Sequence, residues 1–100
     1  MDQVVGGTGS VQVATPEIQK ICDEVKPQVE QKTGKKFRVF VAKSFTTQVV
    51  AGTNYFIKVQ VGGEEYAHLK VFQSLPHAGH KLELLSVQTG KTLDEPIVYF

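Results

Sequence analysis

The side chains most able to do chemistry in this sequence are one cysteine, Cys22, and three histidines, His68, His77 and His80. A thiol beside an imidazole would suggest a nucleophilic enzyme or a metal site, because both chemistries need a thiolate near an imidazole nitrogen. Cys22, however, falls on the apolar stripe of a helical pattern, where a buried thiol acts as packing. His77 and His80 have no further ligand pair at metal spacing. We therefore expect no catalytic residue, no metal and no cofactor.

Two short charged clusters also have structural explanations. Lys35, Lys36 and Arg38 could touch nucleic acid, but a basic turn after a helix is favoured by the helix dipole. Glu64 and Glu65 could suggest acid catalysis, yet adjacent strand residues point to opposite faces. Eleven Lys and Arg against ten Asp and Glu leave a formal charge of +1, too little to attract a polyanion. We expect neither a nucleic-acid partner nor a membrane partner.

The length and composition indicate one small soluble domain. The 100 residues, 41% of them hydrophobic, can fill one core but not two. A lone cysteine cannot form an internal disulfide, and no secretory signal pattern opens the chain. No apolar run approaches the roughly 20 residues of a membrane span. We expect a single domain over residues 1–100 in a reducing, cytoplasmic setting.

One amphipathic helix is predicted over residues 16–33. Thr15, Pro16 and Glu17 combine a capping hydroxyl, a proline that needs no donor and an acid at the positive end of the dipole. Gly34 supplies a left-handed C-cap. Pro27 interrupts the pattern opposite the apolar stripe, so we expect a curved helix instead of two. The apolar stripe that would face the core consists of Ile18, Ile21, Cys22, Val25 and Val29.

After the helix the hydrophobic period changes to two, which is typical of strands. The expected strands cover residues 37–47, 53–61, 65–74 and 82–89, with 11–14 as a possible fifth. In the first of them, Phe37, Val39, Val41 and Phe45 should share one face and Phe40 the other. Short connections predict an antiparallel meander covered by the helix, which is an α+β fold.

In such a meander the connections at 48–52 and 75–80 emerge at the same rim, and a flexible N-terminal trunk, residues 1–10, would point there too. These segments are unusually apolar for loops. Val49 and Val50 lie at the first tip, Leu75 and Pro76 in the second loop, and Val4 and Val5 precede Gly6 and Gly7 in the trunk. They could form a narrow apolar edge that enters a cleft. Equally, the two tip valines could tuck under the sheet and Leu75 could cap the core.

These segments also carry a resemblance to a known family. The run Gln48-Val49-Val50-Ala51-Gly52, followed by residues 53–59, resembles the hairpin signature of the cystatins, and specifically of the stefins or type 1 cystatins. Residues 14–19, 25–28, 69–76 and the Tyr99-Phe100 ending resemble stefin segments in the same order. The resemblance implies a cystatin-like fold of four to five antiparallel strands wrapped around one curved helix.

The resemblance further implies a reversible, tight-binding inhibitor of papain-like cysteine proteases such as papain and the cathepsins. Val4, Val5, Gly6 and Gly7 would lie along the non-primed subsites, and residues 48–52 would sit beside the catalytic cysteine. Leu75, Pro76 and His77 would contact the primed side. Inhibition would follow from occupancy of the cleft, because no peptide bond is offered in attack geometry.

Two further expectations concern partners. A cystatin-fold binding module that does not inhibit proteases is the alternative to an inhibitor, and an enzyme has no residue constellation to support it. Family resemblance also implies a monomer that can form a domain-swapped dimer by straightening the first hairpin. The adjacent β-branched residues Val49 and Val50 could store strain for that change.

Overall fold

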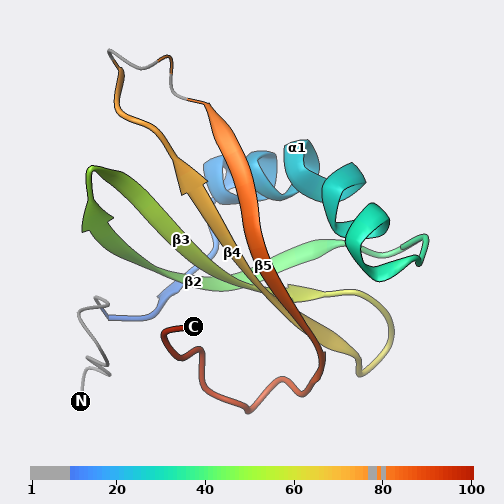
Figure 1. The fold of residues 1–100 in the computed structure, drawn as a ribbon. Helices are drawn as coiled ribbons and strands as arrows, with labels where there is room; N and C mark the ends of the chain where they lie inside the picture. Colours follow the sequence, from blue (N-terminus) through green and yellow to red (C-terminus); the bar gives the residue numbers. More distant parts are fainter. Residues whose placement is uncertain (1–9, 77–78, 80) are drawn as a thin grey trace.

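The computed structural model describes residues 10–76, 79 and 81–100 and contains one helix packed on one face of a five-stranded sheet (Figure 1). All neighbouring strands are antiparallel, in the sheet order β1-β2-β3-β4-β5. The elements in chain order are β1 (Gln12–Val13), α1 (Pro16–Thr33), β2 (Val41–Val50), β3 (Gly52–Gln60), β4 (Tyr66–Gln73) and β5 (Leu82–Lys91). The predicted α+β class is confirmed.

Helix α1 begins and ends where its sequence signals place it. The backbone amide of Ile18 donates to Oγ1 of Thr15 at 3.3 Å, so the N-cap is formed. Gly34 adopts a left-handed φ of 72°, and its amide donates to the Glu30 carbonyl at 2.8 Å. Pro27 lies on the exposed side of one continuous helix that curves around the sheet (Figure 1). Among the described residues, no helix has the length and apolar character needed to cross a membrane.

The core lies between α1 and the facing side of the sheet. Five helix residues at the predicted spacing are buried there: Ile18, Ile21, Cys22, Val25 and Val29. They pack against Ile57 and Val59 of β3, Leu69 and Val71 of β4 and Leu84 of β5. Full burial of each aliphatic side chain contributes about 1.5–3 kcal/mol. The helix is therefore held by its apolar stripe.

The prediction for the first long strand is wrong in its bounds and in its facing residues. Strand β2 starts at Val41 and continues to Val50, instead of covering residues 37–47. Phe40 is buried and lies opposite the exposed Val39 and Val41, as predicted, but Phe37 and Phe45 pack against the same core as Phe40 instead of sharing the face of the two valines. The cause is a register shift between Ala42 and Ser44, which breaks the strict alternation of faces. The bounds of the other strands differ from prediction by one or two residues.

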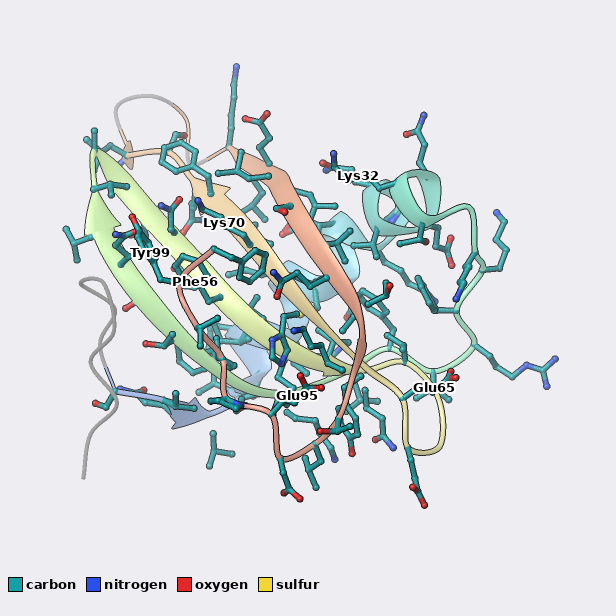
Figure 2. All side chains as sticks on the ribbon, turned by 60° about the horizontal axis from the view of Figure 1, so that its bottom comes forward. Lys32, Phe56, Glu65, Lys70, Glu95 and Tyr99 are labelled. Carbon is teal, nitrogen blue, oxygen red and sulfur yellow. The ribbon has the colours of Figure 1, made fainter. Side chains whose placement is uncertain are left out.

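The opposite face of the sheet is covered by the chain end, residues 92–100, which we call the C-terminal strap. Phe56 of β3 is fully buried beneath it and contacts the rings of Tyr99 and Phe100, with centroids 5.5 and 5.7 Å away. The ammonium of Lys70 lies 5.8 Å from the Phe56 ring and 5.7 Å from the Tyr99 ring. Figure 2 shows Phe56, Lys70 and Tyr99 gathered on this face. The sheet is therefore buried on both faces along this row.

Candidate functional site

The tip of the β2–β3 hairpin is a tight turn instead of the loop predicted over residues 48–52. The strand pairing runs through Gln48–Asn54 and Val49–Thr53 to Val50–Gly52, so only Ala51 lies outside the strands. Val49 is 84% exposed and Val50 is also exposed. The tip valines do not tuck under the sheet. A rigid ladder thus presents two apolar side chains to solvent at its end.

A side-chain hydrogen bond ties the two strands together just below this tip. Nδ2 of Asn54 donates to Oε1 of Gln48 at 3.1 Å. The two residues are direct cross-strand partners, and Asn54 is buried. Because Gln48 belongs to the predicted site, Asn54 supports one of its members. Counting back from the turn would have placed Asn54 opposite Gln48, so this cross-strand pair could have been predicted from the sequence.

The second predicted segment follows β4 at the same end of the sheet (Figure 1). Leu75 is 38% exposed, and Pro76 is exposed as well, so Leu75 does not cap the core. The base of this loop is closed twice. The amide of Ser74 donates to the Lys81 carbonyl at 2.9 Å, and the amide of Lys81 donates to Oγ of Ser74 at 2.7 Å. His77 lies outside the described residues.

The hairpin tip and the end of β4 are in direct contact. Gly52 has a φ of 129°, and a Cβ atom at this position would lie 2.5 Å from the Gln73 carbonyl oxygen and 2.8 Å from the Phe72 ring. Only glycine allows this approach. The contact places the exposed Val49–Val50 tip beside the strand that leads directly into Leu75. The two apolar segments therefore lie at the same end of the sheet, and we call the surface they form the binding edge.

Strand β1 relates the trunk to this edge. Gln12 pairs with Phe45 and Val13 with Ser44, so β1 runs antiparallel to β2. Each step back along β1 therefore corresponds to a step forward along β2, in the direction of Val50. The predicted trunk residues Val4, Val5, Gly6 and Gly7 lie outside the described residues, as does most of the segment expected to be flexible.

The one cysteine of the chain, Cys22, lies in the core and not at this end of the sheet. Cys22 is fully buried in the core beneath α1, and burial raises the pKa of its thiol to about 12. The thiol is therefore protonated at neutral pH and enclosed by packing. Within the described part of the chain, no group of three His, Cys, Asp or Glu residues could hold a metal ion. What the edge offers is apolar contact surface on a rigid frame.

The family assignment follows from comparison with known proteins. The family model described as the Cystatin domain matches residues 6–94, and the chain belongs to the cystatin family. It is 51% identical to Cystatin-B of Oplegnathus fasciatus over 100 residues, which is the full length of both chains. It is 54% identical to Cystatin-B of Homo sapiens over 95 residues, covering 95% of this chain and 97% of the relative.

A third relative has a name that states an activity. Leukocyte cysteine proteinase inhibitor 1 of Sus scrofa is 50% identical over 99 residues, covering 99% of this chain and 96% of the relative. The identities extend over almost the whole chain in each case. The resemblance to the stefins stated from the sequence is thus confirmed at the level of the family.

Proposed function

We propose that this chain is a reversible inhibitor of papain-like cysteine proteases, such as papain and the cathepsins, and not an enzyme. The observation that carries the proposal is the 84% exposure of Val49 at the end of a strand ladder, at the same end of the sheet as the exposed Leu75. The inhibitor name of the porcine relative supports the same function. A wedge of this kind acts by occupying the active-site cleft.

In this proposal each segment of the edge has a role. Residues 48–52 lie beside the catalytic cysteine, and Leu75, Pro76 and His77 contact the primed side. Val4, Val5, Gly6 and Gly7 lie along the non-primed subsites. Burial of apolar surface supplies the free energy, at about 25 cal/mol per Å². Because strand pairing already orders the tip, little conformational entropy is lost on docking.

The proposal also covers the domain organisation, the cofactor requirement and the cellular setting of the chain. Residues 1–100 act as one domain that needs no cofactor. A reducing, cytoplasmic setting suits a chain whose only cysteine, Cys22, is free and buried.

The protein acts mainly as a monomer. A domain-swapped dimer forms when the turn at Ala51 straightens and joins β2 to β3 as one long strand. A strictly monomeric elution profile after mild heating would contradict the swap.

The test of inhibition is a titration of active papain with the parent chain and two aspartate variants. Val49→Asp places a charge in the proposed contact. Val13→Asp is its matched control, because Val13 is 82% exposed but lies on β1, away from the tip. We expect one-to-one inhibition by the parent and by Val13→Asp. Val49→Asp should weaken inhibition by at least about 100-fold, the cost of burying an unpaired charge.

A parent chain that leaves papain fully active would contradict the proposal. It would favour the alternative of a cystatin-fold binding module with another partner. Equal losses in both aspartate variants would show that the tip is not the contact, because the control carries the same change of charge.

A further inference from the structure

We infer that Phe72 is a positioning residue for the proposed binding edge: its ring supports the hairpin tip and fixes that tip relative to the loop that begins at Ser74. This inference rests on the proposed function, because it names a residue that would hold the inhibitory wedge in shape. Phe72 belongs to none of the three predicted segments, and it is partly buried on β4.

The first step is the contact between Phe72 and the tip. Cε1 and Cζ of Phe72 both lie 2.8 Å from the position a Cβ atom would take at Gly52. The ring therefore fills the space that the missing side chain leaves. Gly52 follows Ala51 directly, and Ala51 is the turn residue of the hairpin. Lateral movement of the turn toward β4 is blocked by this ring.

The second step is that the last two residues of β4, Phe72 and Gln73, and the next residue, Ser74, each hold a different part of the edge. Phe72 contacts the tip. Gln73 presents its carbonyl oxygen to Gly52, and its Oε1 accepts a hydrogen bond from the Tyr55 hydroxyl at 3.2 Å. Ser74 closes the base of the second loop through Lys81. The end of β4 is thus the physical link between the two apolar segments.

The third step concerns the free-energy cost of ordering the tip when it docks. Without the ring, the turn would still be held by the β2–β3 ladder, the Asn54–Gln48 hydrogen bond and the β3–β4 pairing at Thr53–Gln73, but the volume of the ring beside Gly52 would be empty. A tip that moves in the free protein must be ordered on docking, and that cost appears mainly as faster dissociation. We expect about a tenfold increase in koff for Phe72→Ala.

Phe56 provides a matched control, because it is also an aromatic residue on the strap-covered face of the sheet. It is fully buried, and its ring contacts are with Tyr99 and Phe100. Phe56→Leu should lower the melting temperature as a core truncation does. It leaves Gly52 and its neighbours on β4 unchanged. Loss of stability and loss of tip positioning can therefore be separated.

The experiment uses the full chain and three variants: Phe72→Ala, Phe72→Tyr and Phe56→Leu. Backbone ¹⁵N order parameters of Ala51 and Gly52 are measured in the free protein. The association and dissociation rates are measured on immobilised papain whose catalytic cysteine is blocked by a small alkylating group. For Phe72→Ala we expect order parameters that fall from about 0.85 to below about 0.6, together with the faster koff. In Phe72→Tyr, the order parameters and koff should both stay close to those of the parent.

Three results would overturn the inference. The first is an unchanged tip order parameter in Phe72→Ala, even with a faster koff, since the ring would then only touch the protease. The second is an equal rise in koff for Phe56→Leu, since the effect would then follow stability alone. The third is a mobile tip that binds as tightly as the parent. If the parent fails to bind papain, the proposed function fails, while the order parameters still decide whether Phe72 fixes the tip.

Discussion

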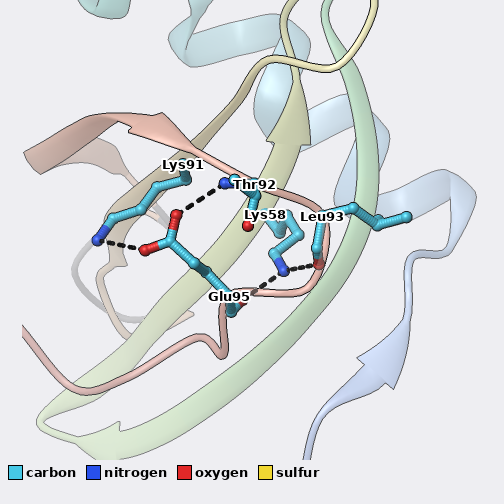
Figure 3. Close-up of polar contacts among 5 residues, drawn as sticks. All are labelled: Lys58, Lys91, Thr92, Leu93 and Glu95. Atoms are coloured by element: carbon cyan, nitrogen blue, oxygen red, sulfur yellow. Dashed lines mark hydrogen bonds and ion pairs between the residues drawn. The ribbon is translucent and has the colours of Figure 1, made fainter.

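Lys58 of β3 donates hydrogen bonds from its buried ammonium group to the backbone carbonyl of Glu95 (Figure 3). The same ammonium also binds the carbonyl of Leu93. The carboxylate of Glu95 accepts a hydrogen bond from the Thr92 amide at 2.8 Å and lies 3.6 Å from Nζ of Lys91. One side chain of the sheet thus anchors the start of the C-terminal strap.

The first prediction concerns this anchor. Lys58→Met should lower the free energy of unfolding by about 2–3 kcal/mol, because two carbonyl groups lose a charged donor. The measurement is urea unfolding at neutral pH. Lys43→Met is the control, since Lys43 is exposed on β2 and should change stability by less than about 0.5 kcal/mol. Equal stabilities of the two variants would show that the strap does not depend on Lys58.

The second prediction is a pH dependence set by His68. Its side chain is 1% exposed beneath the strap, and neither ring nitrogen has a hydrogen-bond partner within the described residues. Burial, together with the positive charges of Lys58 and Lys91, lowers the pKa of His68 from 6.5 to about 4, against an opposing effect of Glu95. The imidazole is therefore neutral in the folded protein at pH 5–7.

The direction of the effect follows from linkage. Above pH 6.5 His68 is neutral in both states and costs nothing. Between pH 6.5 and about 4 the unfolded chain binds a proton that the folded protein refuses, so the free energy of unfolding falls as the pH falls. The total loss is roughly 3 kcal/mol. His68→Gln should flatten this part of the curve. A parent curve as flat as that of His68→Gln would contradict the buried neutral imidazole.

The third prediction concerns Gly52. Gly52→Ala should cost about 1–3 kcal/mol, because its φ of 129° disfavours a side chain and the new Cβ would meet the Gln73 carbonyl at 2.5 Å. Inhibition should weaken as well, since the turn must shift. Gly63→Ala is the control, because nothing lies within 4 Å of a Cβ at Gly63. Thermal unfolding and papain titration check both effects. An alanine tolerated at position 52 would mean that the tip is not held against β4.

The fourth prediction concerns the trunk. Removal of residues 1–7 should weaken binding mainly through a larger koff, because the hairpin tip and the second loop can still dock. The association rate should change little. Kinetics on active-site-blocked papain, with the parent measured in parallel, provide the test. An unchanged dissociation rate would show that Val4, Val5, Gly6 and Gly7 make no contact of consequence.

The helix and the strand order could be predicted because their signals are local. Thr15 and Gly34 fix the helix ends with their own backbone and side-chain chemistry. The packing of Phe45 against the same core as Phe40 could not be predicted, since it depends on a register shift near Lys43 that no residue type indicates. Local patterns therefore determine elements, whereas irregular pairing determines which side chains reach the core.

The residues of the candidate site were predicted from their types, but their support was not. An apolar tip at Val49 is visible in the sequence because valines are unusual in a turn. The contact of Phe72 with Gly52 joins positions on two strands, and it depends on how the sheet twists. The hydrogen bonds of Lys58 to the strap likewise join distant parts of the chain. Their acceptors are backbone carbonyls, which every residue type has, so the sequence does not indicate them.

The central claim is that the hairpin tip and the second loop enter the protease cleft together. Amide hydrogen exchange of the complex with active-site-blocked papain tests it most directly. We predict strong protection at Val49, Val50 and Leu75 and unchanged exchange at the Gly62–Gly63 turn, which lies at the opposite end of β3. Protection at that turn with an unprotected hairpin tip would contradict the account.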